Sequence, residues 1–260
     1  MPSAFANKVV IVTGASSGIG RALVLRLATA GARVGLIARR RPLLDQLSGE
    51  LQCPNAVAVA DVGDRISIHA AINTIRESLG PIDVLIANAG VGTPTLLDPI
   101  NISDVEKMFR INLMGTIYSL EAVLPEMLKR KQGHLAVVSS LAAFKGLPGE
   151  SGYCASKAAL NTYMEGLRIQ LRGKGVGVTV VCPGFVNTPM TEVNDFPMPF
   201  LMSADRAAEH ILWAIRTRKK LYRFPRGTSL LTRFLGILPD WLVAKTMSDY
   251  NDKPPMNELK

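Results

Sequence analysis

The segment KVVIVTGASSGIG (residues 8–20) decides the fold. Its continuous β-branched run leads into glycine and then into a helical pattern, which predicts a buried strand over 8–14 and a helix over 18–31. At this junction we expect a pyrophosphate to bind, held by Gly14, Ser16, Ser17, Gly18, Ile19 and Gly20. Glycine lets phosphates approach closely, and a helix N-terminus offers unpaired N–H groups and a positive dipole end. An ordinary turn is the alternative, but the position between strand and helix favours a dinucleotide.

The same alternation of strand and helix continues along the chain. Further strands are predicted at 32–39, 56–61, 82–90, 134–140 and 176–184, and helices at 41–51, 64–79, 104–131 and 151–173. Crossover helices between short buried strands predict one doubly wound α/β (Rossmann) domain over 1–260, with a parallel sheet and helices on both faces. Ligands of such folds bind at the carboxyl ends of the strands.

Composition narrows the class of protein. A chain of 260 residues that is 48% hydrophobic and 20% charged can bury a large core. The sequence has no signal peptide, no apolar run long enough to span a bilayer and only three widely spaced cysteines, so we expect a cytoplasmic protein with reduced thiols. The formal net charge of +9 comes largely from residues 216–226, and this local concentration does not indicate nucleic-acid binding.

The second strand ends in Ala38, Arg39 and Arg40. Chains that bind NAD usually carry a carboxylate at this end, where it holds the ribose 2′-hydroxyl. A guanidinium can instead bind a 2′-phosphate in bidentate fashion, so we predict NADP(H) as the cofactor. The alternative is that both arginines are solvated loop charges.

The next two strand ends offer further cofactor contacts. Asp61, followed by Val62, can accept a hydrogen bond from the adenine amino group. Asn88 can tie neighbouring strand ends together, and Gly90, after Ala89, lets the backbone pass close to the ribose. Each pair taken alone is also compatible with an ordinary turn.

A serine, a tyrosine and a lysine form the candidate catalytic group. Ser140 ends a strand, and Tyr153 and Lys157 share one face of the following helix. A free tyrosine has a pKa near ~10, and a nearby ammonium or an oxidised nicotinamide favours its phenolate. We therefore expect Tyr153 to transfer a proton, Lys157 to lower its pKa and hold the nicotinamide ribose, and Ser140 to polarise a carbonyl. Ser139 and Ser140 do not sit in the GxSxG motif of a serine hydrolase, and the sequence has no HExxH motif or Cys/His cluster that would indicate a metal site.

As a set, these features resemble the short-chain dehydrogenase/reductase family over at least residues 8–190. The motifs that carry the resemblance are TGASSGIG (13–20), Asp61, ANAG (87–90), Asn112, Ser140, YCASK (153–157) and PGFVNTPM (183–190). The resemblance implies a Ser–Tyr–Lys–Asn site in which Tyr153 donates or accepts the proton. It also implies that the backbone of Asn112 joins a water relay through Lys157.

The resemblance extends to the cofactor and to assembly. It implies cofactor contacts from Pro183 and Gly184, and contacts of Thr188 and the Val186 backbone with the nicotinamide carboxamide. The position of Arg39 matches the NADP-preferring subgroup. Ser17 stands where another NADP subgroup has a basic residue, so Arg39 carries more of the specificity. A homodimer or homotetramer is implied, formed through the helices at 104–131 and 151–173.

The last third of the chain carries two unusual segments. Residues 191–202 are rich in Pro, Phe and Met, which is typical of a lid over a lipophilic small-molecule substrate, although simple packing explains them equally well. Within 227–247 the apolar residues Leu230, Leu231, Phe234, Leu235, Leu238, Trp241 and Leu242 recur at helical spacing after the basic block. This pattern resembles an interfacial anchor, so residues 216–247 are candidates for peripheral membrane contact. Packing across the pocket mouth or against a second subunit is the alternative.

Two functions follow from the sequence. The first is an NADP(H)-dependent oxidoreductase that interconverts a ketone or aldehyde with an alcohol. The second is a non-catalytic NADP(H)-binding regulator or scaffold. The complete Ser–Tyr–Lys set favours the enzyme, because a scaffold has no use for an activated phenol.

Overall fold

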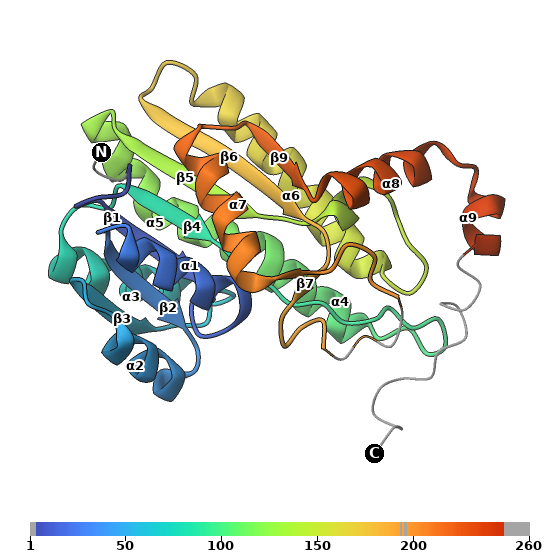
Figure 1. The fold of residues 1–260 in the computed structure, drawn as a ribbon, viewed down its shortest axis with the longest axis horizontal. Coiled ribbons are helices and arrows are strands. Elements are labelled where there is room, and N and C mark those ends of the chain that lie inside the picture. The colour runs from blue at the N-terminus through green and yellow to red at the C-terminus, as the bar shows by residue number, and fades with distance from the viewer. Residues whose placement is uncertain (1–3, 193, 195–196, 247–260) are drawn as a thin grey trace.

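A computed structural model of the chain describes residues 4–192, 194 and 197–246. Seven parallel strands form one sheet in the order β3-β2-β1-β4-β5-β6-β9 (Figure 1). The strands are β1 (Val9–Thr13), β2 (Arg33–Ala38), β3 (Asn55–Val59), β4 (Val84–Ala87), β5 (Gly133–Val138), β6 (Val176–Pro183) and β9 (Leu221–Phe224). The predicted doubly wound parallel sheet is thus confirmed. The strand order reverses between β1 and β4, the point at which ligands bind in such folds.

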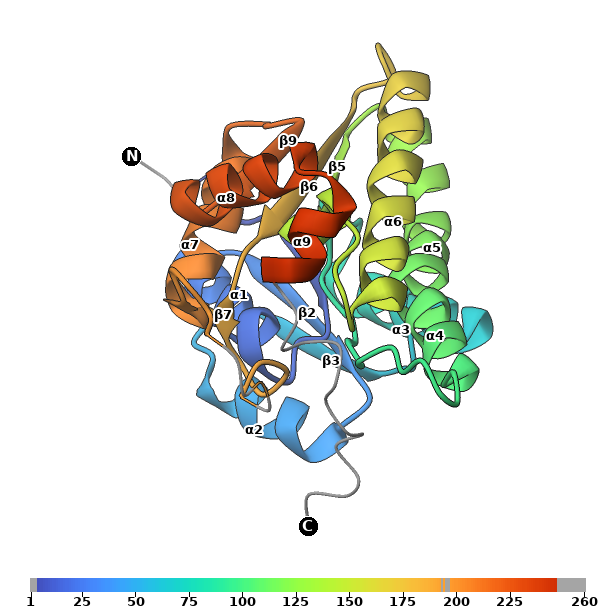
Figure 2. The same cartoon turned by 90° about the vertical axis from the view of Figure 1, so that its right-hand side faces the viewer.

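Helices cover both faces of the sheet (Figure 2). One face packs against α1 (Gly18–Thr29), α2 (Arg41–Glu50) and α7 (Ala204–Arg216), and the other against α3 (Arg65–Leu79), α5 (Gly115–Arg130) and α6 (Ser151–Gln170). Successive β1 residues alternate between the two cores: Val10 and Val12 face the first, Val9 and Ile11 the second. Because both faces are covered, β1 is apolar throughout, as its sequence suggested.

The long helix predicted over 104–131 is interrupted in the structure. It consists of α4 (Ile102–Met108), a π-helical segment (Phe109–Met114) and α5. Such wider turns occur mostly at functional sites, and this one contains the fully buried Asn112. Apolar spacing did not reveal the interruption, because the helix continues in the same direction on both sides of it.

The C-terminal third contains elements that the sequence analysis did not identify. Helix α7 leads into β9, which pairs in parallel with β6 at the edge of the sheet. Two short strands, β7 (Val186–Asn187) and β8 (Met202–Ser203), flank the predicted lid, of which residues 193, 195 and 196 lie outside the described part.

The amphipathic segment predicted over 227–247 forms two helices. These are α8 (Arg226–Ile237) and α9 (Asp240–Thr246), and residue 247 lies outside the described residues. Leu238 adopts an extended conformation between them, as expected for a residue that precedes proline. Among the described residues, no helix is both long enough and apolar enough to cross a bilayer.

Candidate active site

The turn after β1 leaves its backbone open on the pocket side. Gly14 has φ +68°, and a Cβ at this position would lie 2.9 Å from the Cα of Ala89. A Cβ at Gly20 would lie 2.1 Å from the carbonyl oxygen of Gly14. Both positions therefore require glycine. The first N–H groups of α1 have no partner within the helix and no side-chain cap from Ser17, so the turn fits a pyrophosphate.

Arginines from the end of β2 flank this turn. Arg40 Nη2 donates to the hydroxyls of Ser16 and Ser17 at 2.9 and 2.8 Å. Arg39 lies beside the next strand end, with Nη1 3.9 Å from Asp61 Oδ2. The sequence analysis gave Arg39 the larger role, but in the structure it is Arg40 that contacts the turn. Together the two side chains make this end of the pocket cationic.

Asn88 ties the ends of β1 and β4 together, as the sequence suggested. Its Nδ2 donates to the carbonyl of Thr13 at 3.0 Å, while the backbone N–H groups of Asn88 and Ala89 each donate to Thr13 Oγ1 at 3.1 Å. A Cβ at Gly90 would lie 3.2 Å from Asn112 Oδ1 and 3.3 Å from Lys157 Nζ. A larger residue at this position would therefore have to displace the end of one of these two side chains.

Tyr153 and Ser140 face each other from α6 and from the end of β5. Burial raises the pKa of Tyr153 to about 12, the interaction with the Ser140 hydroxyl lowers it, and the nearby Glu150 raises it further. In the cofactor-free protein the net shift of this pKa is therefore upward, opposite to the lowering that we expected from Lys157. Ser140 Oγ also accepts the N–H of Ala142 at 3.1 Å, which fixes the serine at the start of a 3₁₀ turn (Leu141–Phe144).

Lys157 is buried beneath the pocket. Its Nζ donates to the carbonyl of Val138 at 3.2 Å, and its own carbonyl accepts a bond from Ser139 Oγ at 3.4 Å. Burial lowers the pKa of the Lys157 ammonium to about 8. The lysine is thus held at the end of β5 with a charge that its surroundings only partly compensate.

Asn112 holds the loop that follows β4. Its Oδ1 accepts the N–H of Val91 at 2.8 Å, and its Nδ2 donates to the Val91 carbonyl at 2.9 Å and to Ser156 Oγ at 3.0 Å. Ser156 Oγ also donates to the carbonyl of Tyr153 at 2.8 Å. The Asn112 carbonyl accepts a bond from Thr116 Oγ1 at 3.0 Å.

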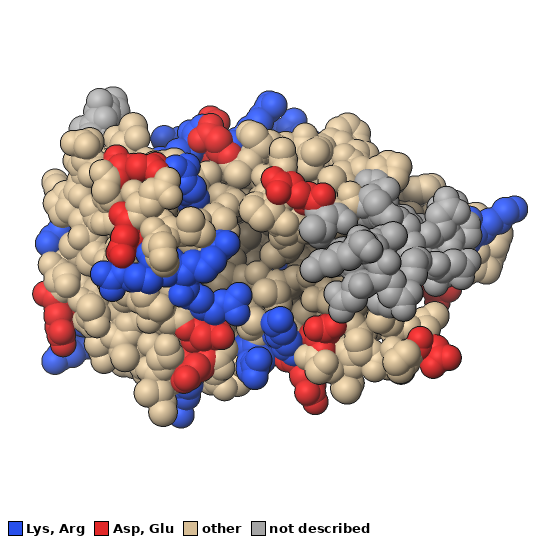
Figure 3. Space-filling model, turned by 90° about the horizontal axis from the view of Figure 1, so that it is seen from below, with Lys and Arg blue, Asp and Glu red and all other residues tan. Residues whose placement is uncertain are grey.

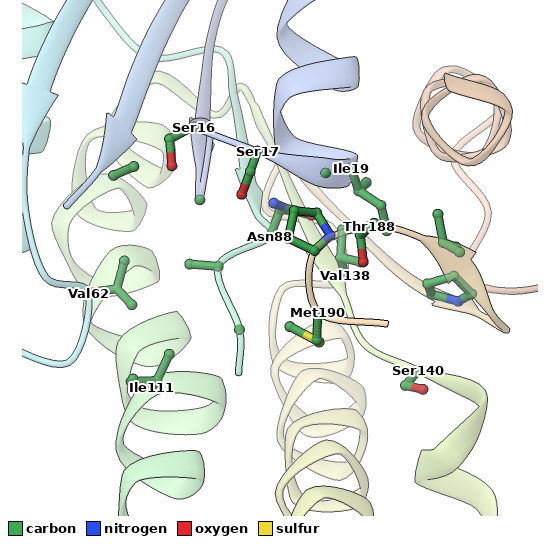
Figure 4. A pocket seen from close by; sticks show the side chains of 18 of the residues that line it. Ser16, Ser17, Ile19, Val62, Asn88, Ile111, Val138, Ser140, Thr188 and Met190 are labelled. Carbon is green, nitrogen blue, oxygen red and sulfur yellow. The ribbon is translucent and has the colours of Figure 1, made fainter. Parts of the chain in front are cut away.

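Most predicted site residues line one pocket. It contains Gly14, Ser16, Ser17, Gly18, Ile19, Arg39, Arg40, Asp61, Val62, Asn88, Ala89, Gly90, Ser140, Tyr153, Lys157, Pro183, Gly184, Val186 and Thr188. Figure 4 shows Ser16 and Ser17 on the turn before α1, and Ser140 across the pocket from them. From below, the surface is hollowed near its middle, and basic side chains gather along one rim (Figure 3). Gly20 and Asn112 support the pocket without lining it.

Other pocket and supporting residues were missed by the sequence analysis. Further lining residues are Ala38, Ala60, Ile111, Val138, Ser139, Pro189, Met190 and Thr191. Thr13 and Ser156 lie inside the quoted motifs, but nothing in their type distinguished them from packing residues. Glu150 was also missed: burial raises the pKa of its carboxyl to about 7. Its place one helical turn before Tyr153 was the available signal.

The fold and the pocket together define an oxidoreductase of the kind that uses a pyridine nucleotide. The family model for short chain dehydrogenases matches residues 8–196. The chain belongs to this family.

Known relatives and structures agree with this assignment. An uncharacterized oxidoreductase of Myxococcus xanthus is 42% identical over 233 residues, which is 88% of this chain and 92% of that protein. A short-chain dehydrogenase/reductase from Burkholderia phymatum, solved in complex with NAD, is similar with a TM-score of 0.81 and 25% identity, covering 88% of this chain and 92% of that one. The closed form of a serine dehydrogenase complexed with NADP+ is similar with a TM-score of 0.79 and 27% identity, covering 85% of this chain and 95% of that one. The two structures hold different nucleotides.

Proposed function

We propose that the chain is an NADP(H)-dependent oxidoreductase that interconverts a ketone or aldehyde with an alcohol by hydride transfer. The observation that carries the proposal is that Ser140 and Tyr153 line the same pocket as the glycine turn, close enough for the serine hydroxyl to lower the pKa of the phenol. A phenol and a hydroxyl that converge in this way can bind one substrate oxygen between them. When bound, the nicotinamide supplies or accepts the hydride.

The residues of this chain then handle the proton and the orientation. Tyr153 donates the proton to the carbonyl oxygen in reduction and removes it from the hydroxyl in oxidation. Ser140 donates a hydrogen bond to the same oxygen and stabilises the charge that develops on it. Lys157 binds the nicotinamide ribose from below, where Val138 already holds its ammonium. Asn112 keeps the loop after β4 in place and contributes its carbonyl to the proton relay.

The preference for NADP(H) is supported by the cationic end of the pocket. Arg40 already donates to two hydroxyls at the turn, and its guanidinium and those hydroxyls can bind a 2′-phosphate together. Arg39 adds a second positive charge, opposed by Asp61 at 3.9 Å. An unmodified 2′-hydroxyl offers these groups no charge to neutralise.

The substrate proposed is lipophilic. Met190, which lines the pocket, and Phe200 and Leu201 of the lid are exposed, with 43%, 58% and 46% of their surface open. An apolar substrate would cover this surface, whereas a polar one would leave it in water. Assembly into a homodimer or homotetramer through α5 and α6, which lie side by side in Figure 2, is proposed by resemblance to the family.

The test follows the absorbance of the reduced nicotinamide. Purified protein is incubated with NADPH and a panel of ketones and aldehydes of rising chain length, and with NADP+ and the matching alcohols. We expect turnover that rises with the apolar size of the substrate. Tight NADPH binding without turnover across the whole panel would instead support the non-catalytic regulator.

A further inference from the structure

The outer face of α8 and α9 carries large apolar side chains that the described chain leaves uncovered. Leu230, Phe234, Ile237 and Trp241 are exposed over 64%, 57%, 79% and 69% of their surface. In α8 only Thr228 is buried. A helix that buries so little in its own domain needs another reason to be apolar on its outer side.

The same face is positively charged. Arg226, Arg233 and Lys245 are exposed on these helices, and neither arginine has a carboxylate partner among the described residues. Asp240 is the single acid between residues 216 and 246, and it is paired with Lys145 at 3.2 Å. The uncompensated charge therefore lies beside the apolar side chains rather than away from them.

The face is also joined to both sides of the pocket mouth. On one side the Phe200 ring of the lid packs on Gly227, where a Cβ would lie 2.6 Å from the ring. On the other, a Cβ at Gly236 of α8 would lie 3.9 Å from the carbonyl oxygen of Phe144, in the 3₁₀ turn that starts directly after Ser140. Helix α8 thus lies between the lid and the turn that carries the serine, as Figures 1 and 2 indicate for the helices.

We propose that this α8–α9 face docks on an anionic lipid bilayer. Basic side chains interleaved with exposed Phe, Trp, Leu and Ile match a surface of negative headgroups over acyl chains. A second copy of the chain fits less well, because a two-fold interface would bring Arg226 and Arg233 against the same positive patch. Docking itself does not depend on the proposed function. We also infer that the bilayer delivers a lipophilic substrate between the lid and the 3₁₀ turn, and this second step rests on the proposed function.

Vesicle flotation tests the docking. The full chain is mixed with vesicles of phosphatidylcholine alone or of phosphatidylcholine with phosphatidylserine, and the floating fraction is measured at low and high salt. We expect binding to the anionic vesicles that weakens with salt. No binding to either vesicle, or equal binding to both, would overturn the proposal.

Matched variants locate the contact. Phe234→Glu should reduce the anionic partition coefficient at least about tenfold, and the pair Arg226→Gln with Arg233→Gln roughly 25-fold. Ile66→Glu is the control, since Ile66 is 82% exposed on α3, at the other end of the molecule (Figure 1). Binding unchanged by Phe234→Glu would overturn the proposal, as would a light-scattering mass showing that this variant instead splits an oligomer.

A second readout separates docking from catalysis. In a Trp213→Phe background, Trp241 fluorescence should shift to the blue on adding anionic vesicles, with no turnover needed. Far-UV circular dichroism checks that each variant is folded. If the chain is an oxidoreductase, Phe234→Glu should slow reduction of a ketone dissolved in vesicles while leaving that of a water-soluble ketone unchanged. If Phe234→Glu changes the rate by the same factor for both ketones, delivery from the bilayer is refuted. Complete lack of turnover with either ketone would refute the proposed function alone.

Discussion

Lys157 Nζ lies 5.8 Å from the centroid of the Tyr153 ring, and neither group has its ordinary pKa. Burial raises the pKa of Tyr153 to about 12 and lowers that of Lys157 to about 8. Both shifts favour the neutral forms, because the pocket floor poorly solvates a charge. The cofactor-free protein therefore keeps the phenol protonated, and a positive charge brought into the pocket would favour the phenolate.

Tyr153→Phe should abolish most turnover without loss of cofactor binding. The phenol is the group positioned to exchange a proton with the substrate oxygen, so kcat should fall by roughly 100- to 10,000-fold. Isothermal titration should give an NADPH dissociation constant within about threefold of wild type, since the ring is retained. Tyr163→Phe, on the exposed side of the same helix, is the control. Wild-type turnover in Tyr153→Phe would refute the assignment.

Lys157→Met should stabilise the cofactor-free protein while removing activity. Lys157 has an ordinary pKa of 10.5 and a folded pKa of about 8, so stability is lost as pH falls from the ordinary value to the folded value. Replacing it should add up to about 3 kcal/mol near pH 7 and little above about pH 10.5. Thermal unfolding at both pH values measures the difference, with exposed Lys174→Met as control. An equal change in stability at both pH values would mean that other groups compensate the buried charge of Lys157.

The sheet and most of the pocket could be predicted because short apolar strands end in polar motifs. Once the strands are parallel, Gly14, Asp61, Asn88 and Ser140 must share one edge. The sequence could not show which arginine turns toward Ser16, because the path of the backbone after β2 decides which of two adjacent side chains faces the turn.

The C-terminal third was harder to predict. Strand β9 is four residues long and includes the arginine of LYRF, so its pairing with β6 depends on tertiary contacts rather than on pattern. The pKa of Tyr153 shifts opposite to the predicted direction, because the sequence shows the nearby lysine but not the burial of the phenol.

Asn112→Ala should destabilise the protein and disturb the loop after β4. The substitution leaves both backbone groups of Val91 without their Asn112 partner and removes the bond that Ser156 Oγ accepts. We expect a loss of about 3 kcal/mol in the free energy of unfolding, measured by urea denaturation. The control is Asn73→Ala, which removes only an exposed bond to Arg76. Similar urea midpoints for the two variants would contradict the role given to Asn112.

Arg40→Ala should change the choice of nucleotide more than the rate of reaction. Arg40 binds Ser16 and Ser17 at the turn, so its loss removes the charged partner of a 2′-phosphate and leaves the glycine backbone intact. We expect KM for NADPH to rise roughly 10- to 100-fold, with little change for NADH. Arg41→Ala is the matched control, because Arg41 pairs with Asp45 on the next turn of α2. Steady-state kinetics with both nucleotides decides the matter. An equal rise in KM for both would assign Arg40 to the shape of the turn rather than to recognition of the phosphate.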